Sequence, residues 1–238
     1  ALGLTTCRTE WRTRRSLVAA RRRRTRVRRW RVRFAGTGFA GDYKAAESFA
    51  DQLIDKWIDR GEVEFISEFA RPLPQMVMAT VLGFPLEDLD KLAEWGTAQV
   101  AAFVYGKGHR NQLSEEQLAE QFQKLDGFKE YVADMVRDRR KNPKDDMISW
   151  LCQVEYQALG RKLTDMEVNG VVYAMVIGGL ETTQYALEEE AQLLCENPQY
   201  FQKLKGDREL IRQFIEESMR LRSPTQGLST RITSQDEE

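Results

Sequence analysis

"IGGLETTQYA", residues 177–186, lies at the centre of a segment that has the apolar periodicity of a helix. Each of its two glycines costs about 1 kcal/mol relative to alanine in a helix interior. Its two threonines are β-branched, and their hydroxyls can bond back to the preceding turn. A helix that keeps these residues at its midpoint needs a physical reason for having them.

The surrounding residues predict a single long helix from residue 164 to residue 197. Thr164 and Glu167 have the spacing of a capping box at its start, and Asn197 stands before a proline at its end. The apolar stripe of this helix comprises Val168, Val171, Val172, Met175, Val176, Gly179, Thr182, Thr183, Ala186, Leu187, Leu193 and Leu194. Glycine and threonine therefore remove the bulk from the middle of the stripe.

A gap in an otherwise bulky helix face indicates that something else comes close, either a neighbouring helix backbone or a flat ligand. Glu181 stands at the edge of this gap. A carboxylate beside an apolar face is expected to have a perturbed pKa, which suits proton transfer. Close helix packing, with Glu181 exposed or paired with an arginine, explains the same pattern, so both interpretations stay open at this point.

The composition bounds the class of protein. The chain has 238 residues, of which 42% are apolar, enough for one sizeable core. No run approaches eighteen apolar residues, and no signal-peptide segment opens the chain, so we expect no membrane span. Cys7, Cys152 and Cys195 lie far apart beside the lone His109, which argues against a zinc site and favours a reducing, cytoplasmic setting.

Charge is distributed unevenly along the chain. Residues 1–33 hold 13 arginines and one acid, a net charge of +12, so the remaining residues carry −13 of the total of −1. The basic segment also contains Trp11 and Trp30, and arginines with aromatic residues fit phosphate contact and base stacking on a nucleic acid. A solvated or disordered tail is the competing interpretation. We therefore divide the chain into an arginine-rich segment, 1–35, and a helical body, 36–238.

The helical body has amphipathic segments at 43–60, 86–106, 114–141 and 208–223, besides the long helix. Ser114 and the acids after it predict a capped helix start, and the basic residues before Asn142 suit its end. Minor strands are expected near 62–66 and 228–233. Glu217 and Arg220 are three residues apart on one helix face and can form an ion pair, although such a pair on its own is common at protein surfaces. The fold class predicted is mainly α.

In combination, these motifs resemble the cytochrome P-450 family of haem-thiolate monooxygenases. Gly178 to Thr183 fit the pattern [AG]-G-x-[DE]-T-[TS] of the family's long helix, and Glu217 and Arg220 fit its E-x-x-R helix. The segments "VEFISEFARPLPQMVMATVLGFPLEDLDKLAEW" and "NPKDDMISWLCQVE" resemble the soluble bacterial type. The resemblance extends over roughly residues 40–238.

The resemblance implies a reaction and a set of roles around the long helix. Haem would lie against that helix, with Gly178 and Gly179 making room for the cofactor and dioxygen. Thr182 would hydrogen-bond the dioxygen and Glu181 would relay protons. Glu217 and Arg220 would be a structural ion pair. The substrate would be a small organic molecule and the electron donor a ferredoxin-type protein.

The resemblance also gives roles to residues near both ends of the chain. Arg231 matches an arginine that binds a haem propionate, and Trp11 and Arg15 match the spacing of two further propionate ligands. Nucleic-acid binding by the basic segment is then less favoured. From residue 19 to residue 35 the match degrades into arginines, and we hypothesise a shifted reading frame, which reading the coding DNA in all three frames would test.

The largest departure from the family pattern concerns the iron ligand. The family's haem cysteine lies in a glycine-rich loop beyond the position of Arg231, and Cys7, Cys152 and Cys195 do not have that context. We therefore expect an internal fragment that contains no metal ligand and gives no thiolate–haem absorption band by itself. Two alternatives stay open: a degenerate gene product, or a non-catalytic α-helical interaction protein with a basic nucleic-acid-binding arm.

Overall fold

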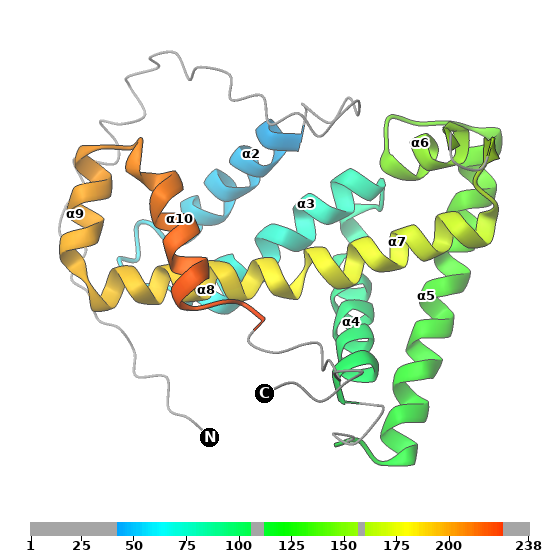
Figure 1. Cartoon of the computed structure of the whole chain (residues 1–238), viewed down its shortest axis with the longest axis horizontal. Helices are drawn as coiled ribbons and strands as arrows, with labels where there is room; N and C mark the ends of the chain where they lie inside the picture. The colour runs from blue at the N-terminus through cyan, green and yellow to red at the C-terminus, as the bar shows by residue number, and fades with distance from the viewer. Residues whose placement is uncertain (1–41, 106–111, 157–159, 226–238) are drawn as a thin grey trace, which may run out of the picture.

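The computed structural model describes residues 42–105, 112–156 and 160–225, and most of these are helical (Figure 1). The helical elements are α2 (Asp42–Asp55), the π-helical turn η2 (Ile66–Ala70), α3 (Pro72–Leu82), the 3-10 turn η3 (Leu86–Asp88), α4 (Leu89–Val100), the π-helical turn η4 (Ala101–Tyr105), α5 (Glu115–Lys141), α6 (Met147–Gln153), α7 (Asp165–Gly179), α8 (Glu181–Glu196), α9 (Pro198–Gly206) and α10 (Leu210–Leu221). A short antiparallel hairpin joins β1 (Glu155–Tyr156) to β2 (Arg161–Lys162). The prediction of a mainly α protein with minor β structure is confirmed.

The α7 and α8 helices run almost end to end and form the long axis of the molecule (Figure 1). The α4 and α5 helices pack together and against α7, while α9 and α10 pack against α8 at the opposite end. The α3 helix contacts both α7 and α8. Helices from all three described ranges of the chain therefore pack along the axis formed by α7 and α8.

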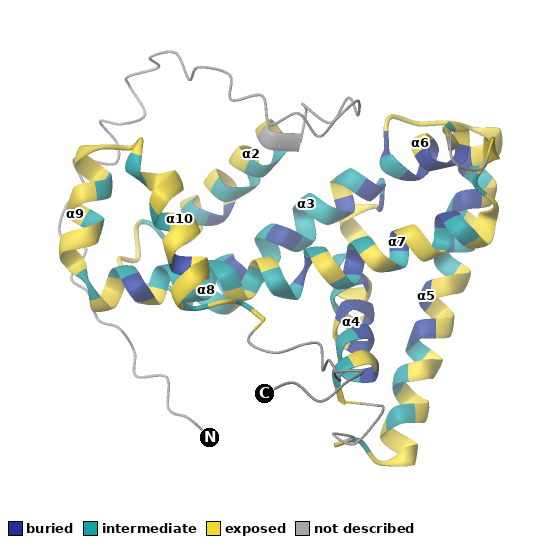
Figure 2. Ribbon diagram, viewed as in Figure 1, coloured by how far each residue is buried: buried dark blue, intermediate teal, exposed yellow. Residues whose placement is uncertain are grey.

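The main core lies where α7 meets α3, α4, α5 and α6. Val168, Val172 and Val176, on one face of α7, are 0% exposed and pack in one cluster with Phe128 and Val132 of α5 (Figure 2). The apolar stripe predicted for this helix is confirmed at these valines. It is wrong at Val171 and at Thr183, which are exposed, because neighbouring residues lie about 100° apart around a helix.

Both predicted helix starts carry their caps. The Thr164 hydroxyl accepts from the backbone N–H of Glu167, and the Glu167 carboxylate accepts from the backbone N–H of Thr164 at 2.7 Å. Ser114 and Gln117 form the equivalent capping box at the start of α5. Arg161 adds a bidentate ion pair to Glu167, at 2.8 and 2.9 Å, so the first turn of α7 is held to β2.

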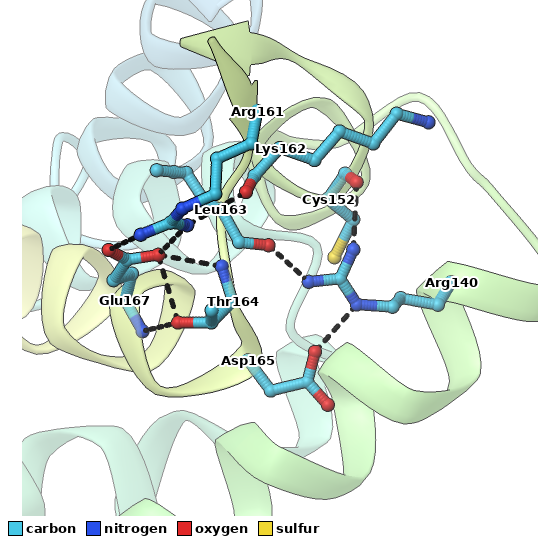
Figure 3. Close-up of polar contacts among 8 residues, drawn as sticks. All are labelled: Arg140, Cys152, Arg161, Lys162, Leu163, Thr164, Asp165 and Glu167. Atoms are coloured by element: carbon cyan, nitrogen blue, oxygen red, sulfur yellow. Dashed lines mark hydrogen bonds and ion pairs between the residues drawn. The ribbon is translucent and has the colours of Figure 1, made fainter. Parts of the chain in front are cut away.

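Arg140 joins several segments at the same end of α7 (Figure 3). Its Nε donates to Asp165 Oδ1 at 2.6 Å, and its two Nη atoms donate to the carbonyl oxygens of Cys152 and Leu163, at 3.0 and 2.6 Å. One guanidinium therefore fixes the ends of α5 and α6 and the segment that leads into α7. The Cys152 side chain is buried, and burial raises the pKa of its thiol.

A buried ion pair lies beside this network. Arg139 donates through Nε to Asp146 Oδ2 at 2.6 Å and through Nη2 to the Gly83 carbonyl at 3.2 Å, and both charged side chains are less than 10% exposed. Asp146 also caps α6 by accepting from the backbone N–H of Ser149 at 2.7 Å. Gly83 has a φ of +81°, and a Cβ there would collide with Asp146. Glycine therefore satisfies both the turn and the close approach of the carboxylate.

The prediction of one continuous helix from 164 to 197 is wrong at Leu180. This residue has φ −94° and ψ −75°, and it separates the end of α7 from the start of α8. Its side chain is 4% exposed, and its Cδ1 lies 2.8 Å from the position that a Cβ on Gly96 of α4 would occupy. Leu180 thus fills space that Gly96 leaves free on the neighbouring helix. Gly178 and Gly179 are weak helix formers, so breaking the helix beside them costs little free energy.

The predicted strand near 62–66 is also wrong, because residues 62–64 are irregular, Phe65 is helical and Ile66 begins η2. A strand needs a partner backbone, and nothing in the described ranges pairs with this segment. The second predicted strand, 228–233, lies outside the described residues. Within the described ranges, no helix has both the length and the apolar character to cross a membrane.

Candidate functional site

The two glycines before the break have different neighbours. A Cβ added to Gly178 would meet no atom within 4 Å, and this residue is exposed. A Cβ added to Gly179 would collide with the terminal methyl of Met78, on α3. Gly178 therefore faces open space, whereas Gly179 allows α3 to pack close to α7.

Thr182 lies one turn after Gly178 and is half-buried. Its Oγ1 donates a hydrogen bond of 2.5 Å to the Gly178 carbonyl. A threonine hydroxyl has a single donor, which this bond uses, so the lone pairs on Oγ1 remain for an incoming donor. The open face of the break thus presents a hydrogen-bond acceptor beside the space next to Gly178.

Glu181 lies in a different environment from Gly178. Its side chain lines a pocket of about 520 Å³ between α3, α4, α5 and α8. Burial raises the pKa of its carboxyl, while the Tyr185 hydroxyl, which donates to Oε2 at 3.3 Å, and the charge of Arg71 lower it. The net pKa shift is upward, because burial is the largest influence on this carboxyl.

Sequence reasoning missed this pocket. Leu180 and Gly96 lie on its wall, and its polar lining includes Arg71 at the start of α3, Glu94 of α4 and Lys124 of α5. These residues are far apart in the chain, and none stands in a recognisable motif. The available signal was Gly96, a glycine inside an amphipathic helix, which indicates the close approach of another side chain.

The remaining predicted residues do not join this site within the described chain. Arg220 Nε pairs with Glu217 Oε2 at 2.8 Å on α10, so the predicted ion pair is present. Both side chains are more than 60% exposed there. Trp11, Arg15 and Arg231 lie outside the described residues.

These features define a helical protein with a central helix broken at a Gly-Gly-Leu-Glu-Thr junction. The junction combines open space at Gly178 with a half-buried acid, Glu181, in a polar pocket. The chain belongs to the cytochrome P450 family, whose model matches residues 103–238. It resembles the polyketide biosynthesis cytochrome P450 PksS of Bacillus subtilis, with 33% identity over 190 residues.

That match covers 80% of this chain and 44% of PksS. The steroid C26-monooxygenase of Mycolicibacterium smegmatis is 29% identical over 77% of this chain and 44% of its own length. The crystal structure of P450BioI in complex with a hexadec-9Z-enoic acid ligated acyl carrier protein superposes with a TM-score of 0.68 and 28% identity, over 78% of this chain and 45% of that one. The chain thus spans a little under half the length of the relatives that it matches.

Proposed function

We propose that the protein to which these residues belong is a cytochrome P450 monooxygenase, which inserts one atom of dioxygen into a small organic substrate. The observation that carries this proposal is the junction at Gly178–Thr182, found in a chain of this family. The open space beside Gly178 supports the placement of a planar group against α7. Haem, when bound, supplies the oxidising chemistry.

The residues of this chain would bind the cofactor and handle protons. Gly178 leaves room for the haem plane, and by resemblance Trp11, Arg15 and Arg231 would bind its propionates. Thr182 would offer its Oγ1 as a hydrogen-bond acceptor at the dioxygen site, because its own proton is donated to the Gly178 carbonyl.

Glu181 would take protons from solvent and pass them to the Thr182 side of the junction. A proton relay works best when its pKa lies near the working pH, and burial moves this carboxyl in that direction. Gly179 would contribute indirectly, since its lack of a side chain sets how closely α3 packs beside the junction. Glu217 and Arg220 would stabilise the fold around the site.

Substrate and partner follow from the family alone. The relatives' names include a polyketide pathway, a steroid and a carrier-bound fatty acid. The substrate proposed is therefore no narrower than a small organic molecule. We propose a ferredoxin-type electron donor and a cytoplasmic location as further parts of the same hypothesis.

A chimera tests this proposal. Residues 42–225 would replace the matching segment of PksS, which would supply the rest of the domain. We expect the reduced carbon monoxide complex to absorb at about 450 nm, as a haem with a thiolate ligand does. A folded chimera that binds haem without this band would contradict the proposal.

The same chimera tests the role of Thr182. In Thr182→Ala the band should persist, while more of the reducing equivalents should end in hydrogen peroxide and fewer in oxidised product. Thr183→Ala is the matched control, because Thr183 is exposed on a neighbouring position of α8. If Thr182→Ala and Thr183→Ala form the same amount of product per reducing equivalent consumed, Thr182 has no role in the mechanism.

A further inference from the structure

Two opposite charges face the pocket from elements far apart in the chain. Arg71 stands at the start of α3, and Glu181 stands at the start of α8. In the described part of the chain, the Arg71 guanidinium makes no hydrogen bond or ion pair, and it does not cap α3. Glu181 has one hydrogen bond there, from the Tyr185 hydroxyl at 3.3 Å, and no ion pair.

The other charged groups of the pocket are already engaged. Lys124 of α5 pairs with Glu120 at 2.9 Å and with Glu94 of α4 at 3.3 Å. Glu64, an acid outside the pocket lining, also has its pKa lowered by the charge of Arg71, but it accepts from the backbone N–H of Ser67 at 2.7 Å. Among the residues that the structure describes, Arg71 is therefore the pocket cation whose charge is left for Glu181.

We propose that Arg71 is a positioning residue for Glu181, and that its charge across the pocket keeps this carboxyl able to release the proton that it takes from pocket water. The proposal deepens the proposed function and rests on it for the destination of the proton. Arg71 lies at the start of α3, outside the glycine, acid and threonine motif, so the motif does not predict this role.

Two opposing influences act on the protonation of Glu181. Half-burial of Glu181 favours its neutral form, and this influence alone makes release of the proton less favourable. A nearby cation favours the carboxylate. A relay must take up and release a proton in turn, so it needs both influences.

Each cycle of this relay is balanced. One proton moves from a pocket water to a carboxylate oxygen of Glu181, and that water regains a proton from bulk solvent. One proton then leaves the acid toward the Thr182 side of the junction. The carboxylate is regenerated, and no electron changes place within the pocket. The volume of about 520 Å³ and the polar lining provide room for the waters.

The experiment measures the titration of Glu181 in the 238-residue chain without haem. Protein labelled with ¹³C at glutamate carboxyls gives one resonance per glutamate, and Glu181→Gln identifies the one from Glu181 by its loss. We expect Arg71→Met to move the Glu181 midpoint to higher pH, and Arg71→Lys to restore it toward the wild-type value. The matched control is Gln75→Ala, a neutral pocket residue one turn further along α3, which should leave the midpoint unchanged.

Arg71→Met removes no hydrogen bond or ion pair from the described part of the chain, so we expect this variant to fold, and far-UV circular dichroism would check this. An unchanged midpoint in Arg71→Met would overturn the inference, and so would equal shifts in Arg71→Met and Gln75→Ala. Since no haem is present, either result would leave the proposed monooxygenase function standing. Failure of the chimera to form the thiolate–haem band would leave the titration result intact.

Discussion

The two ends of α7 are built in opposite ways. At the N-terminal end, Thr164 and Glu167 cap the helix, and Arg140 and Arg161 tie its first turn to α5, α6 and β2 (Figure 3). At the C-terminal end, the helix stops at Gly179 beside open space and a polar pocket, and the described residues form no such network there. The N-terminal end therefore supplies stability, and in the proposed function the C-terminal end is the one left free for a ligand and for proton transfer.

The strongest test of the stabilising end is Arg139→Ala. This change leaves Asp146 buried without its cation, and breaking a buried pair by removing one partner costs about 3–5 kcal/mol. Urea unfolding would measure the loss of unfolding free energy. Arg137→Ala is the matched control, two residues away on α5, because Arg137 pairs with Asp134 at the exposed surface and its loss should cost no more than about 0.5 kcal/mol. Equal effects of the two substitutions would show that the buried pair has no special role.

A smaller effect, of opposite sign, is expected at the junction end. Gly178→Ala should increase the free energy of unfolding by up to about 1 kcal/mol, because alanine is the better helix former and its Cβ meets nothing. Gly170→Ala, on the same helix and equally open, should behave alike. Gly179→Ala should increase the free energy of unfolding by less than either of these changes, because its Cβ must displace the Met78 side chain. A loss of stability in Gly178→Ala would mean that the space beside this residue is filled.

The smallest effect concerns the capping carboxylate. The ion pair with Arg161 and the hydrogen bonds from Thr164 lower the pKa of Glu167 from an ordinary 4.5 to about 2. Because the pKa is lower in the folded protein, the stabilisation is present above pH 4.5 and disappears as the pH falls to about 2. The difference in unfolding free energy between wild type and Glu167→Gln should therefore shrink on acidification. Glu130→Gln, at an exposed position of α5, is the control, and a difference that does not depend on pH would contradict this account.

Local chemistry in the sequence predicted much of this fold. Both capping boxes and the buried valines of α7 depend only on residues a few positions apart. The break at Leu180 was not predicted, because leucine is a good helix former and its position depends on Gly96, in a different helix. The pocket around Glu181 was missed for the same reason, since Arg71 precedes it by more than a hundred residues.

The proposal that Gly178 makes room for the haem is central to this account, and the PksS chimera tests it directly. Phenylalanine would be placed at Gly178 and, as the matched control, at Gly170, which is equally open and lies on the same helix. Both folded variants would then be compared by the absorption of the reduced carbon monoxide complex. Loss of the thiolate–haem band in Gly178→Phe, with the band intact in Gly170→Phe, is the predicted result. An intact band in Gly178→Phe would contradict the claim.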